Sequence, residues 1–385
     1  YGRIDTPIFE DVNVFLRTVG EETDIVSKEM YVFKDRGGQE LALRPEGTAA
    51  VCRAYVEHGL HNQALPVRLF YYAPMFRYDR PQAGRYRQLH QFGAEAIGDS
   101  DPAIDLEIIQ LAMGAIAALG LGRMTLVLNS IGDAADRPGY LSALRDYFRP
   151  HLGALGADDR RRFETNPLRL LDSKDERTAP LLDAAPRSID YLGEEARAHW
   201  ERLLGYLAGL GMDCRTDHRL VRGLDYYTRT VFEVHPDLEG AQSAVCAGGR
   251  YDGLVEQLGG PPTPGVGFAA GIDRLILNMQ RQRVSPPTAP GPVALVAIGA
   301  AARASVLEAA AALRRDGIAA VVAPDRSMRA QLRYASALGA SFAAIMGAQE
   351  MEAGTVTLRA MTEGTQREVA RSELAAAVAA GLSGA

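Results

Sequence analysis

The sequence predicts an α/β protein built from more than one domain. Residues 1–133 alternate strand-like and helical patterns, and residues 220–280 return to strands separated by glycine-rich turns. The segment 134–212 between them is rich in Arg, Asp and Leu and has helical spacing with almost no strand signal. Behind a proline-rich stretch at 283–292, strands and helices alternate again over about ninety residues, which predicts a separate small α/β domain.

The first 133 residues change their pattern several times. Alternation with a period of two indicates a strand, and apolar residues three or four apart indicate a helix. In chain order the predicted elements are an extended segment at 1–7, a hairpin of 30–35 and 40–44, a helix over 45–57, strands over 70–76 and 88–97, a helix over 103–119 and a strand over 124–129. The hairpin turns at Gly37-Gly38, and Pro45 stands near the start of the following helix, where proline is favoured.

The hairpin of residues 70–98 is the most informative segment of the chain. Successive side chains of a strand point to opposite faces. One face of its second strand carries Leu89, Gln91, Gly93 and Glu95, and the other carries His90, Phe92, Ala94 and Ala96. The second set is apolar enough to pack on a core. The first set presents an amide and a carboxylate with a glycine between them, which leaves room for a bound molecule.

Four arginines crowd the connection between these two strands: Arg77, Arg80, Arg85 and Arg87. Guanidinium groups at this density suit phosphate oxygens, which they can bind with two hydrogen bonds each. A solvated hairpin with ordinary surface arginines is the alternative. The Gln/Gly/Glu face beside the loop favours a site that holds an anion and a small polar substrate together.

Two further segments place polar groups beside turns. LRPEGT puts Glu46 and Thr48 at the entry to a helix, where they can clamp an ammonium group or simply cap the helix. LVRGLDYYTRTVFEV puts Arg222 before a tight turn and Tyr226 and Tyr227 after it. For the tyrosines, packing at a sheet edge is the alternative to a place in a site.

Two glycine-rich segments are weaker signals. CAGGRYDGL (246–254) has a double glycine, which permits a positive φ or a close backbone approach. GVGFAAGIDRL (265–275) runs into a helix over 270–280 with Arg274 one turn in. Its glycine spacing differs from the dinucleotide-binding fingerprint and no βαβ unit surrounds it, so it predicts no nicotinamide or flavin site.

Bulk composition sets broad limits. At 385 residues, with 47% hydrophobic and 23% charged residues, the chain has the make-up of a globular protein of two or three domains. The formal net charge is -6, so any contact with nucleic acid must come from local basic patches. Cys52, Cys214 and Cys246 lie far apart with no CxxC pair, which predicts thiols in a reducing cytoplasm rather than a zinc site or a disulfide framework. The sequence contains no run of about twenty apolar residues that would predict a membrane span.

Together these segments resemble histidyl-tRNA synthetases, a family of class II aminoacyl-tRNA synthetases, over practically the whole chain and in that family's order. GRIDTPIFE resembles motif 1, LRPEGT the amino-acid loop, the 70–98 hairpin motif 2 and GVGFAAGIDRL motif 3. NPLRLLDSKD (166–175) matches part of the insertion, and RGLDYY and GGRYDGL match the two histidine-specific segments. Asp273 stands where Glu is frequent and Ala247 where Gly is frequent, and neither change removes a functional group.

The resemblance implies roles for the matching positions. It implies that the histidine substrate is bound by Glu46, Thr48, Gln91, Glu95, Arg222, Tyr226 and Tyr227. It implies that ATP is bound by Arg77, Arg85 and Arg274, and that Arg222, Arg77 and Gln91 are catalytic. The implied reaction joins L-histidine to its tRNA through a histidyl-adenylate and releases AMP and pyrophosphate. ATP is then a substrate accompanied by Mg²⁺, with no zinc and no metal site made by protein groups alone.

The resemblance also implies an architecture. Residues 1–133 and 213–282 are expected to form a catalytic domain with a mixed, mainly antiparallel sheet flanked by helices. A helical insertion is expected at 134–212, a linker at 283–292 and an anticodon-binding domain at 293–385. A cytoplasmic homodimer that acts on tRNA and contacts no membrane is expected, since motif 1 builds a two-fold interface in this class.

The last domain carries a basic face. Its predicted strands cover 293–298, 318–323, 342–346 and 355–359, and its predicted helices cover 304–316, 329–338 and 371–379. Arg326, Arg329 and Arg333 lie on or just before the second of these helices, and the last two share a face because they are four apart. We expect this face to contact the anticodon stem-loop of tRNA, with a solvated basic face as the alternative.

One rival interpretation belongs to a different functional class. A synthetase-like regulatory subunit would bind histidine without charging tRNA. Such relatives lack the histidine-specific arginine segment and the last domain, whereas this chain has both Arg222 and residues 291–385. Because the chain begins at Tyr1 rather than Met, we also expect residues before it.

Overall fold

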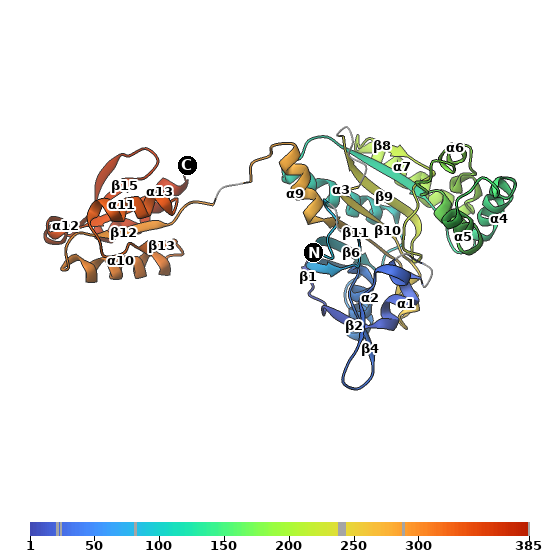
Figure 1. The fold of residues 1–385 in the computed structure, drawn as a ribbon, viewed down its shortest axis with the longest axis horizontal. Coiled ribbons are helices and arrows are strands. Elements are labelled where there is room, and N and C mark those ends of the chain that lie inside the picture. Colours follow the sequence, from blue (N-terminus) through green and yellow to red (C-terminus); the bar gives the residue numbers. More distant parts are fainter. Residues whose placement is uncertain (21–22, 24, 81–82, 238–243, 287–288, 384–385) are drawn as a thin grey trace. The chain divides into compact units, whose positions relative to one another are not determined.

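The computed structural model describes residues 1–20, 23, 25–80, 83–237, 244–286 and 289–383. The chain forms two compact units, Tyr1–Ser285 and Pro286–Ala385, each built on its own main β-sheet (Figure 1). Of the predicted linker at 283–292, residues 287–288 lie outside the described part of the chain. No helix within the described part is both long and apolar enough to cross a membrane.

The first unit contains an eight-stranded sheet with the order β1-β5-β6-β11-β10-β9-β7-β8. Its strands are β1 (Gly2–Arg3), β5 (Val67–Phe76), β6 (Gln88–Ile97), β7 (Met124–Ser130), β8 (Cys214–Thr216), β9 (Thr228–Pro236), β10 (Cys246–Arg250) and β11 (Gly265–Gly271). Neighbours pair antiparallel from β5 through to β7, and parallel pairing occurs only at the two edges. The predicted mixed, mainly antiparallel sheet is confirmed.

Helices cover both faces of this sheet (Figure 1). The α-helices described in the first unit are α1 (Val12–Val19), α2 (Thr48–Glu57), α3 (Pro102–Ala118), α4 (Arg137–Phe148), α5 (Ala157–Thr165), α6 (Ala179–Leu182), α7 (Glu194–Gly209), α8 (Leu254–Gln257) and α9 (Ile272–Arg281). One hydrophobic core packs α1, α2 and α8 on one face, and a second packs α3 and α7 on the other.

The two predicted faces of β6 meet different partners. Phe92, Ala94 and Ala96 pack in the core that contains α3, as their apolar pattern predicts. Glu95 points to the opposite side, where the hydroxyl of Thr48 at the start of α2 reaches it. Alternation along one strand therefore separates a packing face from a polar face.

Two predicted helices begin later than the pattern indicates. The helix predicted from Pro45 begins at Thr48, because the carboxylate of Glu46 accepts the first backbone N–H groups of α2 and so caps it. The helix predicted from Ala270 begins at Ile272, because Ala270 still pairs within β11.

A second, smaller sheet lies at the start of the chain. It consists of β2 (Phe9–Asp11), β4 (Glu40–Leu43) and β3 (Val32–Lys34) in that order. The predicted hairpin of 30–44 is confirmed, since β3 and β4 pair antiparallel. Gly38 in its turn adopts φ 86°, a conformation that favours glycine.

Between β7 and β8 the chain is helical, and no strand occurs among the described residues 134–212. Helices α4, α5 and α6 surround a separate small core that includes Leu144, Phe163 and Leu182. Helix α7 instead buries Trp200 and Leu203 in the core that contains α3. The segment predicted as an insertion thus contributes its last helix to the body of the first unit.

The second unit has the sheet order β13-β12-β14-β15-β16, with parallel pairing among the first three strands and antiparallel pairing beyond them. Its elements are β12 (Val293–Ala297), α10 (Ala302–Arg315), β13 (Ala320–Val322), α11 (Met328–Ala337), β14 (Phe342–Met346), α12 (Ala348–Ala353), β15 (Thr355–Ala360), β16 (Gln366–Ala370) and α13 (Leu374–Ser383). The sequence does not predict β16, an exposed edge strand without apolar alternation, or the single short helix α12.

Candidate active site

A pocket of about 420 Å³ opens on the polar face of the large sheet. It draws side chains from the start of α2, the β5–β6 connection, the turn before β9, and the β11–α9 junction. The predicted residues that line it are Glu46, Thr48, Arg77, Arg85, Gln91, Arg222, Tyr226, Tyr227 and Arg274. Glu95, also predicted, does not line the open space but lies directly behind Thr48.

Glu46 has two surroundings at once. Its carboxylate accepts the backbone N–H groups of Thr48 at 2.7 Å and Ala49 at 2.9 Å, so the helix-capping interpretation is correct. The same carboxylate lies 3.4 Å from the hydroxyl of Tyr226 and lines the pocket. Burial raises the pKa of Glu46, and the two backbone hydrogen bonds oppose that rise. A buried carboxylate at this place suits a positively charged ligand group.

Glu95 is completely buried. Its two oxygens accept hydrogen bonds from Thr48 Oγ1 at 2.8 Å and from the Tyr251 hydroxyl at 2.6 Å. Burial raises the pKa of Glu95 to about 8. Gly267 lies opposite on β11, where an added Cβ would stand 1.8 Å from Glu95 Oε2, so this glycine makes room for the carboxylate.

Tyr226 and Tyr227 line the pocket beside Glu46 and form a tyrosine wall, and Tyr251 packs behind them. The ring centroids of Tyr226 and Tyr227 are 4.7 Å apart, and Tyr251 meets Tyr226 edge-on at 6.1 Å. All three side chains are buried. The sequence does not predict Tyr251 as a site residue, although it lies within the GGRYDGL segment. Its contact with Glu95 joins residues 156 positions apart, which no local pattern shows.

Arg222 lies over the ring of Tyr227, with its guanidinium carbon 5.7 Å from the ring centroid. It forms an ion pair with Glu233, whose other oxygen lies 2.9 Å from His235 Nε2. Burial acts to raise the pKa of Glu233, but His235 and Arg222 together hold it below its usual value. The sequence predicts Arg222 but neither Glu233 nor His235, which follow it on β9 at alternate positions.

Three further arginines converge on the pocket. Arg77 donates from Nε to the carbonyl oxygen of Pro45 at 2.8 Å, Arg85 lies 3.7 Å from Asp79, and Arg274 donates to the Ala244 carbonyl at 3.0 Å. Burial lowers the pKa of Arg274, and the positive charges of Arg85 and Arg77 lower it further. Like charges held together in this way are relieved by an anion, and phosphate oxygens match guanidinium geometry.

Gln91 lies on β6 between Glu95 and the β5–β6 connection that carries Arg77 and Arg85. Its side-chain oxygen is buried and has no hydrogen-bond partner among the described residues. A ligand that donates a hydrogen bond to this buried oxygen would be stabilised in the pocket, because the oxygen otherwise has no partner. The side chain is therefore placed to bind a polar ligand group in the middle of the pocket.

Other residues fix or extend this site. The Asp273 carboxylate accepts the backbone N–H of His90 at 3.0 Å and so ties α9 to β6. Asp172 and Lys174 from the NPLRLLDSKD segment reach the pocket from the helical region. Among the residues with described positions, no group of three or more His, Cys, Asp or Glu side chains is arranged to hold a metal ion.

The remaining predicted residues belong to the second unit. Arg326, Arg329 and Arg333 are all exposed, the first just before α11 and the others on it. Arg329 and Arg333 line a groove of about 560 Å³ together with Arg359, whereas Arg326 does not. Met328, Leu332 and Met361 also line this groove. A groove lined by apolar side chains and arginines suits an unstacked base and its phosphates.

Comparisons with known proteins agree with this geometry. A family model described as histidyl-tRNA synthetase matches residues 1–275, and one described as an anticodon binding domain matches residues 292–380. A histidine--tRNA ligase from Dehalococcoides mccartyi is 51% identical over 376 residues, which cover 97% of this chain and 90% of that protein. The crystal structure of apo S. aureus histidyl-tRNA synthetase matches with a TM-score of 0.80 and 37% identity over 98% of this chain and 90% of that one.

A structure from Bacillus halodurans C, described as an ATP phosphoribosyltransferase regulatory subunit/histidyl-tRNA synthetase, is a weaker match. Its TM-score is 0.59 and its identity 25%, over 84% of this chain and 83% of that one.

Proposed function

This chain belongs to the histidyl-tRNA synthetase family, and from that premise we propose that its pocket joins L-histidine to tRNA through a histidyl-adenylate, with release of AMP and pyrophosphate. One observation carries the proposal. A single pocket combines a carboxylate and tyrosine end with an arginine end, bridged by Gln91. The first end suits an ammonium and an imidazole, and the second suits a triphosphate.

Histidine is proposed to bind at the carboxylate end. Glu46 and Thr48 receive its ammonium group, and Tyr226 and Tyr227 wall its imidazole ring. Glu95, behind Thr48, fixes the Thr48 and Tyr251 hydroxyls and supplies negative charge when it is ionised. A pocket that hydrogen-bonds a polar side chain rejects apolar amino acids, because they would leave its buried polar groups unpaired.

ATP is proposed to bind at the arginine end with Mg²⁺ on its phosphates. Arg77 faces the α-phosphate, and Arg85 and Arg274 face the outer phosphates. A carboxylate oxygen of histidine attacks the α-phosphorus, the bond to the bridging oxygen breaks, and pyrophosphate leaves. Arg222, held against Tyr227 and Glu233, stabilises the charge that grows at the α-phosphate. Positioning and cations therefore supply most of the rate enhancement.

The second step transfers the histidyl group to the terminal ribose of tRNA in the same pocket. The match of residues 292–380 to an anticodon binding domain supports a role for the second unit in holding tRNA. Arg329 and Arg333 with Arg359 are the proposed contacts, and Arg326, just before α11, is a further candidate. The three cysteines are free thiols, which supports the proposed cytoplasmic location.

The regulatory-subunit alternative is not favoured. The histidine--tRNA ligase from Dehalococcoides mccartyi is 51% identical to this chain, whereas the Bacillus halodurans C structure, whose description includes a regulatory subunit, is 25% identical. The chain also has both Arg222 and the second unit. Charging of tRNA with labelled histidine tests the difference: a ligase attaches the label to tRNA in the presence of ATP, and a histidine-binding subunit does not.

The proposed tRNA contacts predict a selective defect. The double variant Arg329→Glu, Arg333→Glu should raise the KM for tRNA about tenfold or more at low salt, because two phosphate-facing cations become anions. Its pyrophosphate exchange, which needs only the first unit, should be unchanged. Arg315→Glu on α10 outside the groove is the control. Charging kinetics equal to wild type at low and high salt alike would give this face some other role.

We also propose a homodimer formed through the small sheet. Phe9 and Phe33 form an edge-to-face pair at 6.3 Å, yet they are 52% and 41% exposed. Val32 and Ile8 beside them are each 47% exposed. Apolar side chains gathered on one exposed sheet are typical of a protein interface, and the motif 1 segment contributes two of these four.

Phe9→Asp should shift the protein from dimer to monomer in sedimentation, because it buries a carboxylate in the proposed interface. Leu210→Asp, an exposed apolar residue at the end of α7, should leave the sedimentation coefficient unchanged. A dimer equally stable in both variants would place the interface elsewhere.

A further inference from the structure

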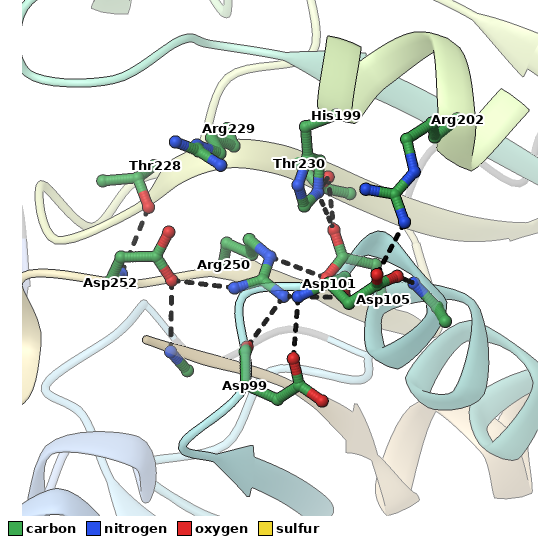
Figure 2. A network of polar contacts seen from close by, with 12 residues as sticks. Asp99, Asp101, Asp105, His199, Arg202, Thr228, Arg229, Thr230, Arg250 and Asp252 are labelled. Carbon is green, nitrogen blue, oxygen red and sulfur yellow. Dashed lines mark hydrogen bonds and ion pairs between the residues drawn. The ribbon is translucent and has the colours of Figure 1, made fainter. Parts of the chain in front are cut away.

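A buried polar network connects β9, which follows Tyr227, with the end of β10, which precedes Tyr251 (Figure 2). Its centre is Arg250 at the end of β10, which is completely buried. Arg250 donates to Asp105 on α3 at 2.7 Å and to Asp252 at 3.0 Å. Its remaining nitrogen donates to the carbonyl oxygens of Asp99 and Asp101 at 3.1 and 3.2 Å. Every nitrogen of this buried guanidinium has a partner.

The network also reaches β9 at two points (Figure 2). The Thr230 hydroxyl donates to Asp105 Oδ2 at 2.7 Å, and His199 Nε2 on α7 lies 2.6 Å from the same oxygen. The Thr228 hydroxyl accepts the backbone N–H of Asp252 at 3.2 Å. Two threonines of one strand are therefore attached to partners of the same arginine.

The pairing of β9 is irregular at Arg229 and Thr230. Gly249 pairs with Val231 but Arg250 pairs with Thr228, so these two residues bulge out of the ladder with β10. Thr230 still pairs with Ser130 on β7. Arg229 in the bulge has φ 45°, a conformation that is strained for any residue except glycine. Bulges of this kind turn the flanking side chains to new directions and are frequent beside active sites.

The bulge lies next to Tyr227, which lines the pocket. Tyr227 directly precedes Thr228, and an added Cβ at Gly249 would lie 2.9 Å from the Tyr227 ring and 2.4 Å from the carbonyl oxygen of Thr230. On the other side of the network, Tyr251 follows Arg250 and donates its hydroxyl to Glu95. The network therefore includes the residue next to Tyr227 and the residues next to Tyr251, whose hydroxyl binds the buried Glu95 carboxylate.

We propose that Arg250 and Asp105 are positioning residues for amino-acid recognition. Through Thr228 and Thr230 they hold the strained bulge in β9, which sets the direction of Tyr227. Through the turn at Asp252 they set the place of the Tyr251 hydroxyl. This inference rests on the proposed function, since it concerns the end of the pocket assigned to histidine. It predicts a defect in histidine binding that does not extend to ATP.

The sharpest test removes one hydroxyl and no charge. Thr230→Val deletes the donor to Asp105 and should raise the KM for histidine in pyrophosphate exchange about tenfold, since small displacements of a positioned group have large effects. The KM for ATP should stay within about twofold of wild type. Thr230→Ser restores the hydroxyl and should restore the histidine KM. Thr125→Val is the matched control, because Thr125 on β7 also donates to a carboxylate, that of Asp237, away from the pocket.

Contrary outcomes are specific. A folded Thr230→Val enzyme with an unchanged histidine KM, or with histidine and ATP KM values raised in parallel, would overturn the positioning role. If Thr230→Val does not fold, Thr228→Val removes the acceptor at the other flank and must show the same selective defect. Wild-type protein without any histidine-dependent exchange would overturn the proposed function instead, and calorimetric titration of histidine into the same variants would then decide the positioning role separately.

Discussion

Arg222→Ala should fold normally and yet lower kcat for histidine-dependent pyrophosphate exchange by about a hundredfold or more. The guanidinium lines the pocket, and its contacts with Tyr227 and Glu233 hold it in place before any substrate arrives. Because it faces charge that grows during adenylate formation, its loss should lower kcat more than it raises the KM for histidine.

The neighbouring arginine provides the control. Arg219 is exposed, pairs with Asp217 and Asp183, and does not line the pocket. Arg219→Ala should therefore retain wild-type exchange, and Arg222→Lys should fall between wild type and Arg222→Ala, since lysine keeps the charge but not the planar fork. Equal exchange rates for wild type and Arg222→Ala would remove Arg222 from the proposed mechanism.

Above a pH of about 8, where Glu95 is ionised, Glu95→Gln should weaken histidine binding by about a hundredfold. The substitution keeps the size of the side chain and removes the negative charge behind Thr48. Isothermal titration of histidine measures the loss directly. Glu107→Gln on α3, which removes a carboxylate paired with Arg68 outside the pocket, is the control. Wild-type affinity in Glu95→Gln would show that this carboxylate does not support histidine binding.

The raised pKa of Glu95 gives the same variant a pH signature. A carboxyl with a pKa of about 8 in the folded protein and 4.5 as its ordinary value binds more protons folded than unfolded. Its contribution to the unfolding free energy therefore falls as pH rises from about 4.5 to 8. Glu95→Gln should remove that fall, so its melting temperature should gain on wild type as pH rises to about 8.

Histidine binding carries the opposite sign. A cationic ligand group prefers ionised Glu95, so wild-type affinity should rise with pH until about 8, and the difference between wild type and Glu95→Gln should grow over the same range. A difference that stays constant with pH would show that Glu95 does not titrate there.

The pattern of the sequence was sufficient for most of the fold. Alternation over 88–97 predicts which face of β6 packs on α3 and which carries Glu95, because a strand has only two faces. The sheet type came from the family resemblance rather than from the pattern. Element boundaries failed where a side chain decides them, as Glu46 does for α2. The exposed edge strand β16 carries no apolar alternation and so gave no signal.

The sequence predicts the site residues that lie in short segments with unusual polar residues. It does not predict those that come together only when strands pair in the sheet. LRPEGT and RGLDYY carry unusual polar residues beside turns, and the structure brings both to one pocket. Glu233 and His235 look like ordinary strand residues, and the alternation of β9 turns both to one face, where Glu233 pairs with Arg222 and with His235. The pairing of Asp105 with Arg250 joins residues 145 positions apart, so no local pattern predicts it.

Formation of an adenylate from histidine and ATP is the reaction proposed for this pocket. Exchange of labelled pyrophosphate into ATP by the full chain, without tRNA, measures that step alone. We expect exchange that depends on histidine and is at background level with leucine or phenylalanine, which leave the buried polar groups unpaired. Background exchange with histidine, or comparable exchange with the apolar amino acids, would contradict it.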